Sequence, residues 1–356
     1  MRVLFRVDSS FVIGTGHVSR CLNLAILLRD KHIHCEFICL RLEGSLIEKI
    51  LNTGFKVNLL QHRIKGEFNL DHENGTFPLD ENFDSQEVVK FLLNNNFDFL
   101  IVDHYSLDFS WERAVRNFVK KIFVIDDLAN RRHDCDFLLD QNFVAQYQSR
   151  YKTLAPKNCK FFLGPKYAIF NKNFEKKRQL KTFKDKPSSI LIYFGGSVIN
   201  NLTQIAIEAV IGLMPELILN IVLSSKNPLY QSIKDRYTNF ANVNIYSDLP
   251  DLSEIILQSD IGIGAGGTTS LERCCLGMPS IVVSIAENQV EISKALDQIG
   301  IIKYLGHFNN VSGKDIQKSL LEILESKNFR CWSTKCFNFM DTSGGDRIVE
   351  ELLKFN

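Results

Sequence analysis

Apolar and polar residues alternate along the first half of the chain in short blocks that predict strands separated by helices. The apolar blocks are MRVLFRVDSS at 1–10, HCEFICL at 34–40, FKVNLL at 55–60, FDFLIVD at 97–103, KIFVID at 121–126 and CDFLLD at 135–140. The stretch SRCLNLAILLRDK at 19–31 predicts a helix soon after the first of these strands. Such alternation is typical of βαβ units on a parallel sheet.

A second series of predicted strands begins near residue 188. Its members are SSILIYFGGS at 188–197, LILNIVLSS at 217–225, NVNIYS at 242–247, SDIGIGAGG at 259–267 and PSIVVSI at 279–285. The charged stretch 171–186 suits a linker, so we place a boundary near residue 170 and expect two α/β domains, 1–170 and 171–356. The pattern leaves open whether the last helical stretch, 346–355, returns to the first domain. The polar segment 62–85 predicts an irregular surface excursion.

Composition narrows the class of ligand. A chain of 356 residues is longer than most domains with a single hydrophobic core, which agrees with two domains. Lysine and arginine total 42 against 41 acidic residues, so no net field favours nucleic acid or an anionic membrane. A small-molecule substrate is expected, and the sequence identifies no protein partner.

Cysteines and hydropathy bear on the compartment. The nine cysteines include no C-x-x-C pair, which points to a reducing compartment. Arg6 and Asp8 interrupt the apolar N-terminal stretch, so it does not resemble a signal peptide, and no run reaches the roughly 18 apolar residues of a membrane span. We therefore expect a cytoplasmic protein.

The glycine-rich loop GIGAGGTTS at 262–270 is the most informative segment. It follows a short apolar strand and precedes a helix predicted to begin near Ser270. Glycines allow close backbone approach, and free amides at a helix N-terminus favour phosphate. Hydroxyls of Thr268, Thr269 and Ser270 add donors, and Glu272, in the predicted first turn, could accept from ribose hydroxyls. The alternative is a tight turn with Glu272 as a surface residue.

The same loop satisfies G-x-G-x-x-G through Gly262, Gly264 and Gly267, with Glu287 about twenty residues further on, as a dinucleotide site requires. However, the match opens late in the second domain, and its first two glycines lie within the predicted strand. We therefore expect no nicotinamide or flavin, and no other cofactor.

Two further patterns carry weaker chemistry. Asp134 and Asp136 form D-x-D, which holds a divalent ion on diphosphate in some sugar-nucleotide enzymes, but a chance D-x-D is frequent and we expect no metal site. Cys274 and Cys275 fall in an apolar helix, where packing is the expected role.

The turn after the first strand forms a second candidate site. Gly14, Gly16 and His17 lie where ligands bind in open α/β folds, at the carboxyl edge of a parallel sheet. A histidine there can act as a general base near neutral pH, or it can merely cap the helix. Asp8, at the end of the same strand, is expected either to orient the imidazole or to cap the turn.

Polar residues follow other predicted strands. Asp103, His104 and Tyr105 end the run FLIV, and Asp126 and Asp127 end KIFVI. These residues either line the site or only close their strands.

The second series has its own polar strand ends. Gly195, Gly196 and Ser197 follow ILIYF and suggest a second phosphate contact. The turn after PSIVVSI supplies the amide groups of Asn288 and Gln289 for a sugar or a phosphate.

Several of these segments, in this order, resemble the UDP-2,4-diacetamido-2,4,6-trideoxy-β-L-altropyranose hydrolase family of pseudaminic acid biosynthesis. In the first half they are FRVDSSFVIGTGHVSRCLNLA, VDHYSLDFSWE, IDDLANRRHDCDFLLDQN, RYKTLAP and FLGPKYAIF. In the second half they are GGS, NNLT, GAGGTTSLERCCLGMPSIVV and ENQ. The second-half loop also resembles the donor site of MurG-type glycosyltransferases.

The resemblance implies a GT-B-like architecture, with two Rossmann-like domains facing across a cleft. It implies that water attacks the anomeric carbon, that UDP is released, and that this carbon inverts without a metal. The first domain would carry the catalytic base, and the second would bind UDP.

The resemblance also implies roles for individual residues. His17 looks like the base, Tyr105 and Asn288 like substrate contacts, and Glu272 like the ribose-binding glutamate. The implied diphosphate cradle comprises Gly266, Gly267, Thr268 and Thr269. The chain departs from the family pattern at Val198 and Ile199, where Asp-Pro often stands, so a polar contact at position 198 is in doubt.

Two other functions stay open from the residues alone. One is a glycosyltransferase that uses the same donor site with a sugar or lipid acceptor. The other is a nucleotide-sugar binding protein without catalysis.

Overall fold

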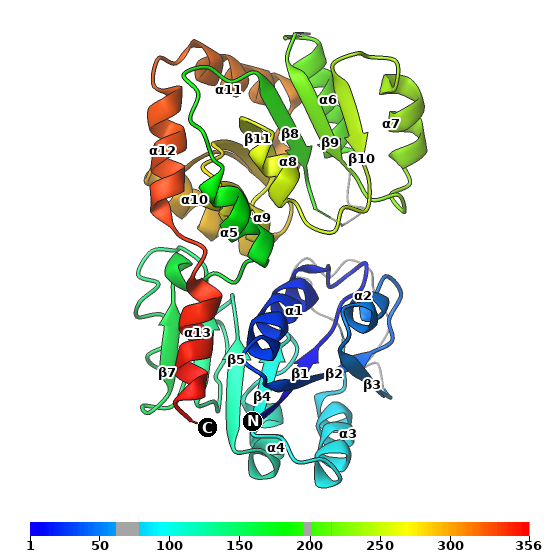
Figure 1. Ribbon diagram of the computed structural model, residues 1–356, viewed down its shortest axis with the longest axis vertical. Coiled ribbons are helices and arrows are strands. Elements are labelled where there is room, and N and C mark those ends of the chain that lie inside the picture. Colours follow the sequence, from blue (N-terminus) through cyan, green and yellow to red (C-terminus); the bar gives the residue numbers. More distant parts are fainter. Residues whose placement is uncertain (62–77, 196–200, 215, 356) are drawn as a thin grey trace. The chain divides into compact units, whose positions relative to one another are not determined.

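The computed structural model describes residues 1–61, 78–195, 201–214 and 216–355, which divide into two compact units (Figure 1). Unit 1 comprises Met1–Ile169 and Ser343–Asn356, and unit 2 comprises Phe170–Thr342. The last helix, α13 (Gly344–Leu353), therefore belongs to the first unit, where it contacts α1 (Gly16–Arg29) and the short 3-10 helix η2 (Pro165–Tyr167). No helix in these described ranges is long and apolar enough to cross a membrane.

Unit 1 is built on a seven-stranded, wholly parallel sheet in the order β3-β2-β1-β4-β5-β6-β7. Its strands are β1 (Arg2–Val7), β2 (His34–Leu40), β3 (Lys56–Leu60), β4 (Phe99–Asp103), β5 (Lys121–Ile125), β6 (Phe137–Asp140) and β7 (Lys160–Leu163). Its other helices are α2 (Ile47–Asn52), α3 (Glu81–Leu93), α4 (Phe109–Val115) and the 3-10 helix η1 (Arg116–Phe118). The six predicted strands all form, whereas β7 was not predicted.

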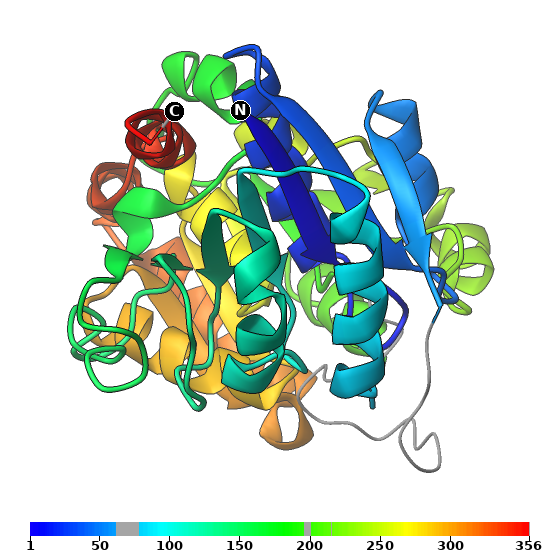
Figure 2. The same ribbon diagram turned by 90° about the horizontal axis from the view of Figure 1, so that it is seen from below.

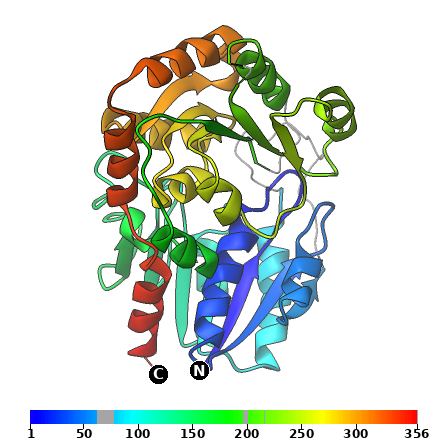
Figure 3. The same cartoon turned by 45° about the horizontal axis from the view of Figure 1, so that its top comes forward.

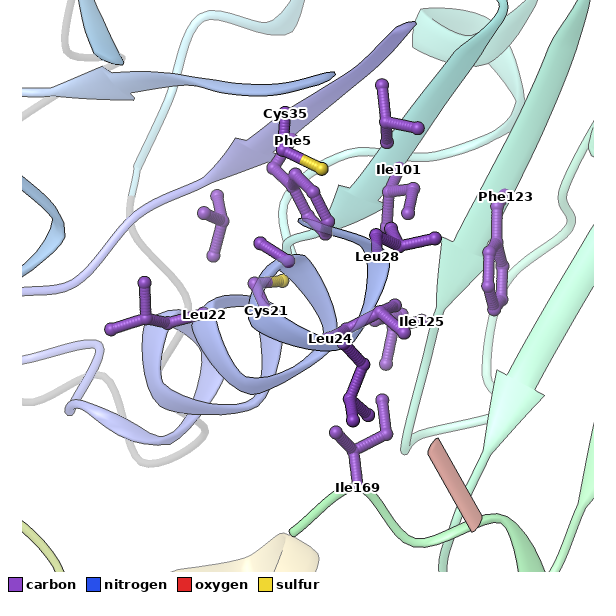
Figure 4. Close-up of a cluster of buried hydrophobic side chains, with 14 of the residues drawn as sticks. Phe5, Cys21, Leu22, Leu24, Leu28, Cys35, Ile101, Phe123, Ile125 and Ile169 are labelled. Carbon is purple, nitrogen blue, oxygen red and sulfur yellow. The ribbon is translucent and has the colours of Figure 1, made fainter. Parts of the chain in front are cut away.

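Alternate residues of β1 serve two cores because side chains along a strand point to opposite faces. Phe5 belongs to a buried cluster with residues of α1, α2 and α13 on one face, and Figure 4 shows it beside Leu28 of α1. Leu4 packs on the other face with residues of α3 and α4, which lie over the strands in Figure 2. Both faces of the sheet are thus buried, so a ligand would bind at the ends of its strands.

Unit 2 has a six-stranded parallel sheet in the order β10-β9-β8-β11-β12-β13. Its strands are β8 (Ser189–Tyr193), β9 (Ile218–Val222), β10 (Val243–Tyr246), β11 (Ile261–Ala265), β12 (Ser280–Ser284) and β13 (Ile302–His307), the last of which was not predicted. The helices are α5 (Lys172–Gln179), α6 (Leu202–Ile211), α7 (Tyr230–Tyr237), α8 (Ser253–Leu257), α9 (Thr268–Cys275), α10 (Val290–Gln298), α11 (Gly313–Glu325) and α12 (Phe329–Phe339), with 3-10 helices η3 (Glu287–Gln289) and η4 (Phe308–Asn310). Helices α6 and α11 lie side by side over one buried core (Figure 3).

The charged stretch 171–186 is not the linker that its composition suggested. Helix α5 occupies its first half and contacts α8 and α9. Phe174 is the one buried residue of this helix, and Arg178 stacks on the Phe337 ring with 3.5 Å between the guanidinium carbon and the ring centroid. The helix is therefore part of unit 2, held by the buried Phe174 and by contacts of Arg178.

The predicted irregular excursion at 62–85 is also partly wrong. Helix α3 begins at Glu81, where Asp80 caps it by accepting from the amide of Phe83 at 3.2 Å. Residues 62–77 lie outside the described part of the chain.

Candidate active site

His17 is the second residue of α1 and lies at the carboxyl edge of the unit 1 sheet, with 7% of its surface exposed. Its Nδ1 is 2.6 Å from Oδ1 of Asp103, the last residue of β4. Strands β1 and β4 are neighbours in the sheet, so the turn from β1 into α1 meets the end of β4. The sheet therefore brings two residues from separate sequence motifs into direct contact.

This contact determines which nitrogen of His17 can act as a base. Burial acts to raise the pKa of Asp103, but Arg20 and His17 outweigh it and hold that pKa well below its usual range. Asp103 is therefore ionised at neutral pH and can only accept hydrogen bonds. The proton of the neutral imidazole accordingly sits on Nδ1, and Nε2, which has no hydrogen-bond partner among the described residues, keeps its lone pair.

Arg20 joins two carboxylates beside the imidazole. Its Nε and Nη2 lie 2.6 and 2.7 Å from the two carboxylate oxygens of Asp103. Its Nη1 is 2.9 Å from Oδ1 of Asp127, which follows β5. This buried network of one arginine and two carboxylates holds Asp103, and through it His17, in one orientation.

Tyr105 and Asn142 complete the network through Asp127. The Tyr105 ring meets His17 edge to face with 4.5 Å between ring centroids, and its hydroxyl donates to Asp127 Oδ2 at 2.7 Å. Asn142, which follows β6, donates to Asp127 Oδ1 at 2.7 Å. Residues after three successive strands of the sheet thus converge beside His17.

Asp8 does not orient the imidazole, so that expectation is wrong, and Asp103 takes the position instead. Asp8 is 1% exposed, and its Oδ2 lies 2.7 Å from Nη1 of Arg6 and 3.2 Å from Nε2 of His104. Its Oδ1 accepts from a backbone amide at the end of β2 at 2.7 Å. These contacts join Asp8 to β1, β2 and the end of β4, so it stabilises the strand ends.

Asp126 also faces inward, toward a buried histidine. His133 is 2% exposed, with its Nδ1 2.7 Å from Oε1 of Glu112 and its Nε2 3.7 Å from Oδ2 of Asp126. Burial acts to lower the pKa of His133, but the two carboxylates outweigh it and raise the pKa to about 9.

We expect the protein to lose stability as the pH rises through 9. The His133 pKa is raised above the unfolded value of about 6.5, so its contribution is complete below about pH 6.5 and is lost toward pH 9, up to about 3 kcal/mol. Urea midpoints at pH 6.5 and 9.5 for the wild type and His133→Gln test this, with the exposed His34→Gln as control. An equal pH dependence in wild type and His133→Gln would contradict it.

In unit 2, most glycines of the loop 262–270 are required by packing. A Cβ added to Gly262, Gly264 or Gly266 would lie 2.6, 2.1 or 2.3 Å from the nearest atom. A Cβ on Gly267 would meet nothing closer than 3.5 Å. Packing therefore explains the first two glycines of G-x-G-x-x-G, whereas a side chain at position 267 would make only an ordinary contact with Gln289.

The free amides of the loop differ from the predicted cradle by one residue. The amide of Gly266 donates to Oε1 of Gln289 at 3.2 Å, and a second backbone amide, after β12, donates to the same oxygen at 3.0 Å. Gln289 thus ties the loop to the turn after β12. The amides of Gly267, Thr268 and Thr269 have no backbone acceptor among the described residues, as the start of a helix requires.

Unsatisfied polar atoms gather around this loop. Oδ1 of Asn288, Oγ of Ser293 and Nε of Arg273 are buried and without a hydrogen-bond partner among the described residues. Ser293 is the residue that a Cβ on Gly266 would strike. Because buried polar atoms are nearly always paired, their grouping beside free amides indicates a ligand site.

The structure corrects two expectations for α9. The helix begins at Thr268, two residues before the predicted start, because Gly267 takes the N-cap position. Glu272 is therefore its fifth residue and not in the first turn. The hydroxyl of Ser270 is buried and donates to the carbonyl of Ala265 at 3.2 Å, so it is not a free donor.

The other predicted glycines occupy turns. Gly14 has φ +81° and its amide donates to the Ser10 carbonyl at 2.9 Å, while Gly16 begins α1. Gly195 has φ +94°, which glycine adopts without strain. Gly196 and Ser197, together with the departure at 198–199, lie outside the described residues.

The D-x-D pair is occupied by basic side chains. Asp136 pairs with Arg116 and lies 3.0 Å from Nζ of Lys121, and Asp134 lies 3.5 Å from Nε of Arg116. Within the described ranges, no group of three or more metal-ligating side chains occurs. Cys274 and Cys275 are buried, as expected for packing residues.

Sequence reasoning missed Arg20, Asn142 and Arg273. Arg20 lies three residues after His17, and because α1 begins at Gly16, before the predicted start at Ser19, this spacing places both on one face of the helix. Asn142 follows a predicted strand, as the other site residues do. Arg273 gave no signal, because a charged residue on a helix is usually exposed.

Comparison with solved structures places the fold. MurG of Acinetobacter baumannii aligns with a TM-score of 0.65 and 15% identity, over 99% of both chains. A UDP-GlcNAc 2-epimerase of Neisseria meningitidis, solved with UDP-GlcNAc, aligns with a TM-score of 0.63 and 14% identity, over 99% of this chain and 100% of that one. The protein thus has the predicted GT-B-like fold of two Rossmann-like units.

Comparison of sequences identifies the family, although no family model matches. The UDP-2,4-diacetamido-2,4,6-trideoxy-β-L-altropyranose hydrolase of Campylobacter jejuni is 30% identical over 262 residues, 73% of this chain and 83% of that one. An uncharacterized protein of Methanocaldococcus jannaschii is 26% identical over 298 residues. The match covers 82% of this chain and 57% of the length of that protein. The chain belongs to the UDP-2,4-diacetamido-2,4,6-trideoxy-β-L-altropyranose hydrolase family, as its motifs predicted.

Proposed function

We propose that this chain hydrolyses UDP-2,4-diacetamido-2,4,6-trideoxy-β-L-altrose, in pseudaminic acid biosynthesis. The names of the Campylobacter jejuni relative and of a bifunctional Helicobacter pylori relative support this substrate and pathway. The observation that carries the proposal is the buried His17–Asp103 pair, which leaves Nε2 of the imidazole with its lone pair.

In the proposed reaction, the oxygen of water bonds to the anomeric carbon while the bond from that carbon to the β-phosphate oxygen breaks. UDP leaves with the bonding electrons, and Nε2 of His17 takes the proton from water. Asp103 then stabilises the imidazolium that forms. Attack opposite the departing UDP inverts the carbon, and because UDP is a good leaving group, the paired carboxylates of glycosidases are unnecessary.

We propose that unit 2 binds the UDP portion. The free amides of Gly267, Thr268 and Thr269 would donate to the diphosphate, with support from the positive end of α9. Asn288 would contact the substrate through its unpaired Oδ1, and Glu272 would accept from the ribose hydroxyls.

Glu272→Ala should weaken UDP binding by about 1.5–3 kcal/mol, the range for a hydrogen bond to a charged group. Calorimetry with UDP measures this. Glu291→Ala, an exposed acidic residue on α10, is the control and should leave the affinity unchanged. Wild-type affinity in a folded Glu272→Ala protein would exclude the ribose contact.

Turnover should persist in EDTA, because amides at the start of α9 take the place that a cation would have on the diphosphate. The measurement is UDP release before and after dialysis against EDTA. Activity that disappears and returns with magnesium or manganese would show that a cation is required.

An assay of UDP release from several UDP-sugars, with and without acceptor sugars and alcohols, tests the proposed function. A hydrolase releases UDP and free sugar without an acceptor. Release that depends on an acceptor would instead indicate a glycosyltransferase, and binding without release would indicate a binding protein.

A further inference from the structure

Arg273 is a buried cation directly beneath the glycine loop of unit 2. Only 2% of its surface is exposed. Its Nη2 donates to the carbonyl of Ala265 at 2.8 Å and to Oγ of Ser270 at 3.0 Å, and its Nη1 donates to Oγ1 of Thr269 at 3.4 Å. Every one of these acceptors is neutral and belongs to the loop or the first turn of α9.

The other deeply buried arginines among the described residues are paired differently. Arg6 contacts the carboxylates of Asp8 and Asp84 at 2.7 and 2.6 Å, and Arg20 contacts two carboxylates in the same way. Arg273 has no carboxylate within 4.0 Å among the described residues, and its Nε has no partner at all there.

An unpaired buried charge is expensive, and a protein usually supplies a partner for it. Burial lowers the pKa of Arg273 to about 10, so the guanidinium remains protonated at neutral pH. The carboxylate of Glu272 acts to raise this pKa but does not offset the effect of burial, and among the described residues no carboxylate forms an ion pair with the guanidinium.

The space next to this charge is where an anion would bind. The neighbouring amides of Gly267, Thr268 and Thr269 have no backbone acceptor among the described residues. At the helix start, a Cβ on Gly267 would meet only the side chain of Gln289, at an ordinary contact distance of 3.5 Å. A ligand anion on these amides would supply the missing negative charge from the other side of the loop.

We propose that Arg273 is the buried counter-charge for the diphosphate of the UDP-sugar. It is a positioning residue that acts through the loop, since its side chain is buried beneath the loop and donates to Ala265, Thr269 and Ser270. Negative charge grows on the β-phosphate oxygen as the glycosidic bond breaks, so Arg273 favours the departing UDP as well as the bound substrate. This inference rests on the proposed function, because it takes the diphosphate of a UDP-sugar as the anion.

A purely structural role makes the opposite prediction for stability. If Arg273 serves only to hold the loop, its removal should lower the Tm of the ligand-free protein. If it is an uncompensated charge kept for a ligand, Arg273→Met should leave that Tm unchanged or raise it, because burying the charge opposes folding. Arg6→Met is the control. It should lower the Tm because it leaves two buried carboxylates without their cation.

The test uses the full chain with Arg273→Met, Arg273→Gln and Arg273→Lys, and measures the Kd of UDP and of uridine together with the ligand-free Tm. We expect the Met and Gln variants to bind UDP roughly 10- to 100-fold more weakly and to bind uridine with unchanged affinity. The Lys variant should retain most of the UDP affinity. Gln keeps donor groups without charge, and Lys keeps charge without the planar fork, so together they separate charge from geometry.

A Gln variant that binds UDP like the wild type, a Lys variant as weak as Gln, or equal losses for UDP and uridine would overturn the inference. So would a lowered Tm in ligand-free Arg273→Met. Failure of the proposed function gives a different result, since the wild type itself would then not bind UDP or would not hydrolyse UDP-sugars.

Discussion

His17→Asn lowers the turnover of the UDP-sugar by about 10²–10⁴-fold, the usual contribution of a general base, and leaves the affinity for UDP nearly unchanged. The change removes the proton acceptor Nε2, whereas the proposed UDP contacts belong to unit 2. The measurement is steady-state UDP release together with UDP calorimetry.

The exposed His34→Asn serves as the matched control, because His34 lies at the start of β2 with 57% of its side chain exposed. It should retain wild-type turnover. A folded His17→Asn protein with near wild-type turnover would leave the fold standing and exclude the mechanism.

Arg20→Met lowers the free energy of unfolding by about 3–5 kcal/mol, the range for removing one partner of a buried ion pair. Asp103 and Asp127 would then face each other in the interior without the cation that separates them. Denaturant unfolding of both proteins gives the difference. Arg29→Met, on the exposed end of the same helix, is the control and should have a far smaller effect.

A second substitution identifies the cause. Adding Asp127→Asn to Arg20→Met removes one of the two carboxylates left without a cation, and it should recover part of the lost stability. An Arg20→Met change below about 1 kcal/mol would be typical of an exposed pair and would contradict the described network.

The strands that were predicted are those with continuous apolar runs, such as KIFVI in β5, because both faces of a parallel sheet are buried. The two strands that were missed lie at sheet edges. Strand β7 has only four residues and begins at Lys160, and β13 contains Lys303 and Gly306. Edge strands bury less surface, so their sequences carry a weaker apolar signal.

The candidate site was located from sequence, but its contacts were not. Strand ends marked Asp8, His17 and Asp103 as neighbours of one edge, yet local sequence does not encode that β4, next to β1, supplies the partner of His17. Asp8 was therefore considered for the role that Asp103 has, with capping of the turn as the alternative. The resemblance identified the family and Tyr105, which the structure places against His17.

In unit 2, the glycines identified the loop, whereas its hydrogen bonds depend on residues that are distant in the sequence. Gln289 uses the amide that had been assigned to the diphosphate, and α9 begins earlier because Gly267 caps it. The role of Arg273 could not be predicted, because its burial and the absence of an ion pair depend on contacts that local sequence does not show.

The position of an oxygen-18 label tests the central claim, hydrolysis at the anomeric carbon, most directly. The enzyme would turn over the UDP-sugar in oxygen-18 water, and mass spectrometry would be applied to both products. We expect one label in the anomeric hydroxyl of the released sugar and none in the phosphates of UDP. Label in UDP would mean that water attacks phosphorus, which would contradict the proposed reaction.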